Sequence, residues 1–92
     1  MGKYYVYFLT NAKRTVLYVG MTDDLKRRIN EHKEGIRFAF TRKYKCFVLV
    51  YFETYNTPEK ALKREKQLKN WHREWKQNLI LKRNPEWKEI NI

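Results

Sequence analysis

Glu65 occupies a position that calls for a chemical partner. It lies three residues from both Leu62 and Leu68 and four from Ala61, so it falls on the apolar stripe of a predicted helix. A carboxylate on this stripe faces the body of the protein, where an unpaired charge is costly. Its partner is therefore either an Arg or Lys side chain, which the spacing alone favours, or a metal ion.

Arg28 and His32 form a second pair of interest. They are four residues apart and share one face of a predicted helix, and this face borders Leu25 and Ile29, which point inward. From there a cation and an imidazole can reach a cleft. The alternative is an ordinary amphipathic helix whose Arg28 and His32 side chains extend into water, and without other information the sequence favours it.

Tyr7 and Tyr18 lie in two short stretches that are typical of β-strands. Alternation places Tyr5, Tyr7 and Leu9 on one face of the first stretch. If the two strands pair, Tyr7 and Tyr18 become neighbours and their hydroxyls converge. The simpler interpretation is that tyrosines pack well in strands, so this observation is weak by itself.

Three strands and two helical regions are expected to position these residues. Residues 3–9 and 16–20 predict an antiparallel hairpin, and the apolar run 46–52 is typical of a strand buried on both faces. Thr22 is the expected N-cap of the first helix, and Gly35 is expected to end that helix.

The second helical region begins at Thr57, where a capping residue is followed by Pro58 and an acid, and it runs to residue 83 with a break near Asn70. Residues 36–45 have no clear period and are expected to form a loop or a short irregular element. The predicted order is β-β-α-β-α-α. This is an α+β fold with a small, three-stranded, mainly antiparallel sheet flanked by helices, in one domain spanning residues 1–92.

The charge of the chain favours an anionic partner. It has 21 Lys and Arg against 10 Asp and Glu, a net charge of +11 on 92 residues. Solubility alone asks for a net charge of about 2–8 in a small domain. DNA, RNA and an acidic membrane surface are the partners that such a charge suits.

The single cysteine and the apolar runs exclude several classes of protein. Cys46 has no partner for an intramolecular disulfide, and no Cys/His pattern for zinc is present. No signal-peptide pattern is evident at the N-terminus, and no apolar run approaches the roughly 20 residues that span a bilayer. We therefore expect a cytoplasmic protein.

The segment 36–45 combines cations with aromatic rings. Its sequence suits a nucleic-acid contact surface, in which cations follow phosphates and an aromatic ring stacks on an unpaired base. The alternative is a solvated loop whose aromatic side chains anchor it to the core. The expected nucleic-acid contacts are Arg37, Arg42, Lys43 and Tyr44.

Two aromatic triplets connect these observations. Tyr5-Val6-Tyr7 and Tyr18-Val19-Gly20 resemble the paired triplets of the GIY-YIG nuclease superfamily, with Tyr7 and Tyr18 eleven residues apart. The second triplet matches with a conservative valine. The first triplet departs from Gly-Ile-Tyr, but it keeps the final tyrosine.

The rest of the family pattern follows in order along the chain. Arg28 lies eight residues after Gly20, where the family has its arginine, and His32 lies one helical turn later. Glu65 matches the family glutamate in a later helix. The resemblance spans nearly the whole chain and is closest to small stand-alone bacterial members, whose ending resembles Asn84-Pro85-Glu86-Trp87. Asn78 and Asn84 both compete for the place of an asparagine found near the site in larger members.

The resemblance implies a metal-dependent nuclease that hydrolyses phosphodiester bonds, in DNA more than in RNA. Glu65 would hold a divalent metal ion, Mg²⁺ in the first place, and Arg28 would neutralise phosphate charge. Tyr7 would take a proton from the attacking water, which requires nearby cations to lower its pKa. Tyr18 would position the water or the phosphate, and His32 would bind phosphate or relay a proton.

Two other functions stay open at this point. A nucleic-acid-binding module without catalysis would use the same fold and charge, with the tyrosines only packing. A membrane-surface protein would use the basic C-terminal helix, on which Trp71 and Trp75 share a stripe, although a core stripe explains these residues better. If the nuclease interpretation holds, Tyr7, Tyr18, Arg28 and Glu65 should line one cleft.

Overall fold

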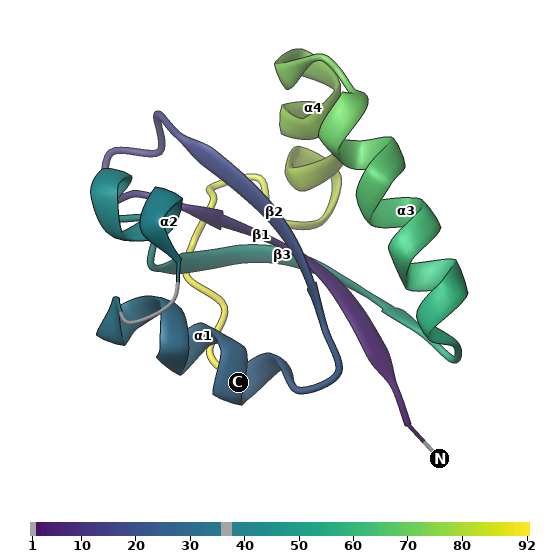
Figure 1. Cartoon of the computed structure of the whole chain (residues 1–92). Coiled ribbons are helices and arrows are strands. Elements are labelled where there is room, and N and C mark those ends of the chain that lie inside the picture. Colours follow the sequence, from purple (N-terminus) through teal and green to yellow (C-terminus); the bar gives the residue numbers. More distant parts are fainter. Residues whose placement is uncertain (1, 36–37) are drawn as a thin grey trace.

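Three antiparallel strands form the frame of the protein, in the order β2-β1-β3 (Figure 1). The computed structural model describes residues 2–35 and 38–92. Each strand pair is antiparallel, as predicted, and β1 lies in the centre of the sheet. The elements in chain order are β1 (Tyr4–Thr10), β2 (Leu17–Thr22), α1 (Leu25–Glu34), α2 (Ala39–Tyr44), β3 (Val48–Tyr55), α3 (Pro58–Asn70) and α4 (Arg73–Arg83).

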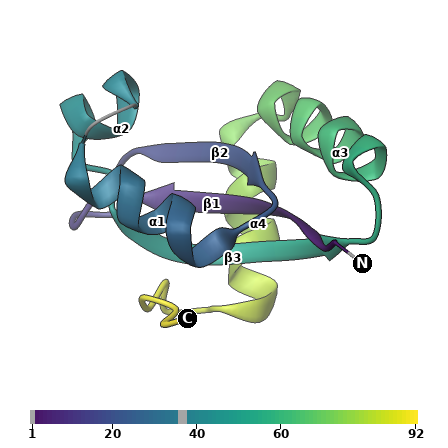
Figure 2. The ribbon, with the colours of Figure 1, turned by 60° about the horizontal axis from the view of Figure 1, so that its bottom comes forward.

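The alternation along β1 sends its side chains into two separate cores. Tyr7 and Leu9 pack with Leu25 and Ile29 of α1 on one face of the sheet. On the opposite face, side chains from β1, β3, α3 and α4 form the larger core, among them Val6, Phe8, Val50, Ala61, Leu68 and Ile80. Figure 2 shows α1 and α2 on one side of the strands and α4 on the other. The predicted division of β1 into two faces is therefore confirmed.

The helix ends match the sequence prediction at three places and differ at one. Thr57 caps α3 by accepting a hydrogen bond from the Lys60 backbone N–H, and the expected break follows Asn70. Gly35 ends α1 with a φ of 71°, a conformation that favours glycine. Thr22 was expected to cap α1, but it is the last residue of β2, and Asp24 caps the helix instead.

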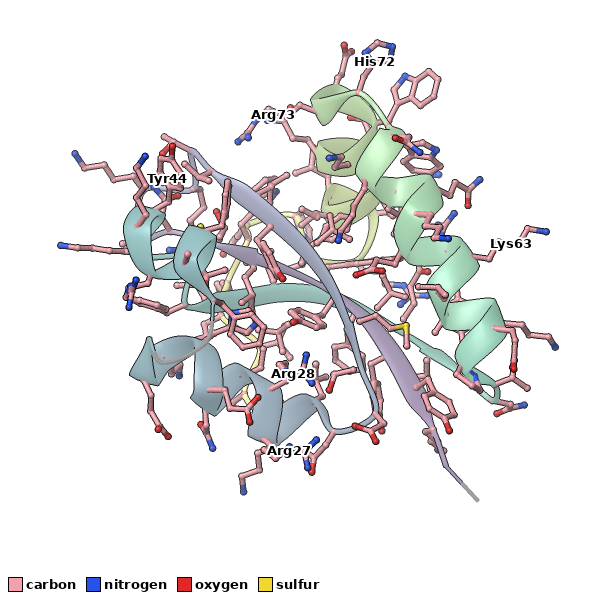
Figure 3. The ribbon with its side chains drawn as sticks, in the orientation of Figure 1. Arg27, Arg28, Tyr44, Lys63, His72 and Arg73 are labelled. Atoms are coloured by element: carbon pink, nitrogen blue, oxygen red, sulfur yellow. The ribbon has the colours of Figure 1, made fainter. Side chains whose placement is uncertain are left out.

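The segment 36–45, which is expected to form a loop or a short irregular element, contains a short helix, α2. Its aromatic and basic sequence has no apolar period, so contacts with the rest of the fold hold it rather than its own pattern. The Thr41 hydroxyl donates to the Phe38 carbonyl at 3.2 Å, and the helix ends at Lys45, whose φ is 55°. Tyr44 projects from the last turn of this helix (Figure 3). The third strand begins at Val48 rather than at Cys46, because the backbone N–H groups of Cys46 and Phe47 donate to the Thr41 and Lys45 carbonyls at the end of α2.

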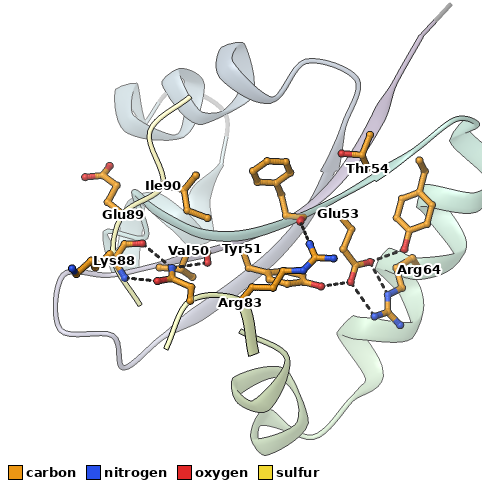
Figure 4. A pocket seen from close by; sticks show the side chains of 12 residues that line it. Val50, Tyr51, Glu53, Thr54, Arg64, Arg83, Lys88, Glu89 and Ile90 are labelled. Carbon is orange, nitrogen blue, oxygen red and sulfur yellow. Dashed lines mark hydrogen bonds and ion pairs between the residues drawn. The ribbon is translucent and has the colours of Figure 1, made fainter. Parts of the chain in front are cut away.

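The C-terminal tail donates hydrogen bonds to backbone carbonyls on the open edge of β3. The Ile90 backbone N–H donates to the Leu49 carbonyl at 2.8 Å, and the Asn84 side-chain amide donates to the Val50 carbonyl at 3.0 Å. An edge strand with unpaired carbonyls invites association with other chains. Asn84 thus has a structural role on this edge, where it borders a hollow of about 770 Å³ (Figure 4).

A hydrogen-bonded ion pair fixes α3 to the sheet. Glu53 of β3 accepts from the Arg64 guanidinium at 2.8 and 3.0 Å and from the hydroxyls of Tyr51 and Tyr55 (Figure 4). Burial opposes ionisation of Glu53, but these hydrogen bonds hold its pKa below the ordinary value. Because Arg64 precedes Glu65 in the chain, the same pair sets the position of Glu65.

We predict that Glu53→Gln destabilises the protein by about 2 kcal/mol, because Arg64 then lacks a carboxylate in a half-buried place. The matched control is Glu86→Gln, which removes an ion pair with Lys88 whose side chains are 71% and 77% exposed. The control should change stability by less than about 0.5 kcal/mol. Urea unfolding measures both, and equal losses would mean that the Glu53 pair does not anchor α3.

Candidate active site

Tyr7 lies at the centre of the site because its cross-strand neighbour is a glycine. Tyr7 pairs with Gly20 in the β1–β2 register, and the Tyr7 side chain is almost completely buried. A Cβ atom at position 20 would lie 2.5 Å from the Tyr7 ring carbon Cζ and 3.0 Å from Tyr18 Cε2. Only glycine therefore lets both tyrosine rings lie against this part of β2.

A chain of buried hydrogen bonds joins Tyr7 to α1 and α2. The Tyr7 hydroxyl is 2.8 Å from His32 Nε2, and His32 Nδ1 is 2.9 Å from the Thr41 hydroxyl. The Thr41 hydroxyl proton is directed to the Phe38 carbonyl, so Thr41 accepts from His32 Nδ1–H. In a neutral imidazole the other nitrogen is then an acceptor. We therefore assign the Tyr7 hydroxyl as the donor to His32 Nε2.

Burial sets the protonation of both members of this pair. Burial, assisted by the positive charge of Arg28, lowers the pKa of His32 to about 4, so the imidazole is neutral at pH 7. Burial, followed by the effect of Tyr18, raises the pKa of Tyr7, and the lowering effect of Arg28 is smaller. A tyrosinate base would require nearby cations to lower the pKa of Tyr7. In the protein alone the pKa of Tyr7 is raised instead.

Arg28 points from α1 toward the strands, whereas Arg27 points outward (Figure 3). The Arg28 side chain is only 20% exposed, and its Nε is 3.1 Å from the Glu31 carboxylate. Its guanidinium carbon lies 5.4 Å from the centre of the Phe38 ring. Arg28 and the buried His32 thus face the interior, and the outward arrangement that the sequence favoured is wrong.

Tyr18 and Glu65 complete the group. The Tyr18 ring centre is 6.3 Å from that of Tyr7 and 5.2 Å from that of His32. Glu65 reaches the group from α3, which packs against β1 and β2. Besides burial, the Glu65 charge raises the pKa of both tyrosines, as a nearby carboxylate must.

Glu65 pairs with a lysine, which is one of the two kinds of partner that the sequence predicted for it. Its carboxylate is 3.2 Å from Lys69 Nζ, one helical turn later, and its side chain is 16% exposed against 51% for Lys69. This exposed lysine can move away without leaving a cavity. Among the described residues, no three His, Cys, Asp or Glu side chains gather into a metal cluster.

The fold brings together Tyr7, Tyr18, Arg28, His32 and Glu65, and it places the expected nucleic-acid contacts beside them on α2. Arg42, Lys43 and Tyr44 are exposed there, and Arg42 also donates to the Gly35 carbonyl at 3.3 Å. Arg37 lies outside the described residues. Asn78 is exposed on α4.

Thr41 was not predicted as a site residue, and Phe38 was expected only as part of the basic and aromatic contact surface of segment 36–45. Thr41 orients His32, and the Phe38 ring stacks on the imidazole with centres 3.9 Å apart. Both lie in the segment expected to be irregular, so no helical spacing pointed to them. The aromatic content of that segment was the signal available.

A family model matches most of the chain. Residues 3–78 match the model of a protein family described as the GIY-YIG catalytic domain. The chain belongs to the GIY-YIG family. This stretch includes all five residues of the group, from Tyr7 on β1 to Glu65 on α3.

Small GIY-YIG-fold relatives cover nearly the full chain. A UPF0213 protein from Haloquadratum walsbyi is 37% identical over 86% of this chain and 89% of its own length. A UPF0213 protein from Syntrophus aciditrophicus is 39% identical over 94% and 98% of the two chains. The solution NMR structure of UPF0213 protein BH0048 from Bacillus halodurans has a TM-score of 0.59 at 29% identity and covers 94% of this chain and 90% of that chain.

The match supports the α+β fold with its three-stranded antiparallel sheet. Four helices accompany the sheet within the described residues, one more than the sequence predicted, because α2 forms. Within residues 2–35 and 38–92, no helix is both long enough and apolar enough to cross a membrane.

The low pKa of His32 predicts a pH-dependent stability. An unfolded histidine titrates near pH 6.5, whereas His32 in the folded protein takes up its proton near pH 4. The unfolded state therefore binds this proton first. The stabilising effect is present above about pH 6.5 and is lost as pH falls toward 4, at about 1 kcal/mol per pH unit between pH 6 and 5.

Urea unfolding at stepped pH, with NMR titration of the His32 ring, measures this effect. His32→Gln identifies the ring signals and should show a flatter stability profile between pH 6 and 5. A His32 titration midpoint near 6.5 would contradict the buried, neutral imidazole.

Proposed function

We propose that the protein is a metal-dependent endonuclease that hydrolyses phosphodiester bonds, in DNA in preference to RNA, at the site formed by Tyr7, Tyr18, Arg28, His32 and Glu65. The observation that carries the proposal is the convergence of these residues from four elements onto one group. Close packing alone does not require a buried tyrosine–histidine hydrogen bond beside an arginine and a carboxylate. Such groups together suit phosphate chemistry.

Arg28 supplies the positive charge that the reaction needs. Its guanidinium is partly buried, so its charge acts through a medium less polar than water. A phosphate oxygen competes with Glu31 for this guanidinium and accepts charge-assisted hydrogen bonds from it. The same interaction strengthens as negative charge grows on the phosphate in the transition state.

Tyr7 and His32 move the proton of the attacking water. Because Tyr7 is protonated and donates to His32 Nε2, its oxygen can accept a proton from water as its own proton passes to the imidazole. Such a concerted relay needs no free tyrosinate, which burial disfavours. Thr41 keeps Nε2 as the acceptor, and Tyr18 borders the space in which the water and the phosphate meet.

Glu65 is the residue that would hold the metal ion. A single, partly exposed carboxylate fits Mg²⁺, which is commonly held by one or two carboxylates with several waters and substrate phosphates. When bound, the ion stabilises the leaving oxygen and the phosphoryl charge.

A non-catalytic nucleic-acid-binding module is the second candidate. The observation in its favour is that Lys69 already pairs with the Glu65 carboxylate at 3.2 Å, so this carboxylate has a cationic partner without a metal ion. This alternative uses the same basic surface, so binding experiments do not separate the two functions. A comparison of DNA cleavage by the parent protein and by a Glu65 variant does separate them.

We predict that Glu65→Gln lowers cleavage of plasmid or branched DNA in Mg²⁺ by at least about 100-fold, because the metal loses its anionic ligand. The variant should still bind DNA, and more tightly, since repulsion from phosphate falls. Its stability should stay within about 1 kcal/mol of the parent, because Lys69 is exposed and tolerates the loss of its partner.

Glu86→Gln serves again as the control and should cleave like the parent. A stability loss of about 3 kcal/mol or more in Glu65→Gln would assign the residue to a structural ion pair. Full cleavage by Glu65→Gln would remove Glu65 from the metal site. No cleavage by the parent protein in Mg²⁺ or Mn²⁺ would favour the binding module.

A further inference from the structure

Two large aromatic rings on α2 are exposed beside the candidate active site. Phe40 and Tyr44 are 45% and 41% exposed, and their ring centres are 4.8 Å apart. The Phe40 ring also lies 5.9 Å from the ring of Tyr18. The rings therefore continue the aromatic lining of the site outward, and Tyr44 stands at its outer edge (Figure 3).

The surface that carries these rings is positively charged. Residues 38–52 contain three cations, Arg42, Lys43 and Lys45, and no Asp or Glu. Lys43 Nζ lies 5.3 Å from the centre of the Tyr44 ring. An exposed pair of aromatic rings beside cations suits single-stranded nucleic acid, because cations bind phosphates while rings stack on bases. A base that stacks on Tyr44 would displace the Lys43 ammonium from the ring, and this exposed cation is then available to a phosphate. A protein partner or a second copy of this +11 chain is less well matched to the charge.

We propose that Phe40 and Tyr44 form a stacking site for unpaired nucleobases next to the phosphate bound at Arg28. Both faces of a base inside a duplex are covered by its neighbours. A protein ring can stack on a base only at an end, a gap, a flap or a single strand. The preferred substrate is therefore a nucleic acid with an unpaired nucleotide adjacent to the phosphate at which it is cut.

The position of the cut rests on the proposed nuclease function, but the stacking site does not. It can be measured by binding alone, in EDTA, where no metal-dependent cleavage occurs. The probes are a fluorescein-labelled DNA single strand of 12 nucleotides, the same strand with consecutive abasic sites, and the corresponding blunt duplex. The abasic strand keeps the phosphates and lacks the stacking faces.

The parent protein should bind the normal strand about 5- to 150-fold more tightly than the abasic strand, the range expected for stacking one base. Phe40→Ala and Tyr44→Ala should each reduce this ratio, and Tyr44→Trp should restore it with quenching of its fluorescence on the normal strand. Trp75→Ala is the matched control, because Trp75 is 53% exposed on the distant α4. It should leave the ratio unchanged.

Several results would overturn the stacking site. A parent protein that binds both strands equally would show that only phosphates are read. Equal weakening of all three probes by Phe40→Ala, with Tyr44→Ala having no effect on the ratio, would assign Phe40 to packing against Tyr18. A loss of the ratio in Trp75→Ala would place stacking elsewhere, and α2 variants that change dimerisation instead would indicate a protein interface.

A cleavage assay then tests the stacking site and the nuclease function separately. If the parent stacks bases but cuts none of a panel of duplex, nicked, flapped and single-stranded DNA in Mg²⁺ or Mn²⁺, the stacking site stands and the nuclease function fails. If it cuts blunt duplex as fast as flapped DNA, the nuclease function stands and the substrate preference is wrong.

Discussion

The buried hydrogen bond between Tyr7 and His32 is the constraint on which the site depends. It crosses from the central strand to α1, and Thr41 extends it to α2. All three side chains are nearly or completely inaccessible to water, so each polar atom left without a partner would cost about 1–3 kcal/mol. The bond therefore fixes how both helices sit on the sheet, and Gly20 provides the space that makes it possible.

The same burial that stabilises this bond limits its chemistry. It keeps His32 neutral and Tyr7 protonated, so neither group is an ionised base at rest. A proton can move only when both transfers are coupled and a compensating charge is close. Besides burial, Arg28 lowers and Glu65 raises the pKa of both tyrosines, so phosphate binding at Arg28 and metal binding at Glu65 would each change the field at the Tyr7 hydroxyl.

Alternation and capping patterns predicted much of the frame. Period-two alternation separated Tyr7 and Leu9 from Val6 and Phe8, because successive side chains of a strand point to opposite faces and a one-residue slip would send each of them into the other core. The helical break after Asn70 followed from the length of the region. The inward position of Glu65 followed from its place near Ala61 and Leu68, which are buried, whereas Leu62 of the predicted stripe is exposed.

The features that the sequence did not predict depend on contacts between residues far apart in the chain or on burial. The helix α2 has no apolar period and is held by hydrogen bonds and stacked rings, so the contacts of Thr41 and Phe38 with His32 were not predicted. The inward direction of Arg28 depends on Glu31 and Phe38, which fill its surroundings. The protonation of Tyr7 depends on burial, which single-sequence spacing does not give.

Single-turnover cleavage by Tyr7→Phe, at saturating protein and well below its melting temperature, tests the central claim most directly. The substitution keeps the ring that packs against Gly20 and removes only the hydroxyl that donates to His32. A proton relay through Tyr7 predicts a loss in rate of about 10²–10⁴-fold with DNA binding retained. Cleavage at the parent rate would show that the hydroxyl serves packing alone and would contradict the account.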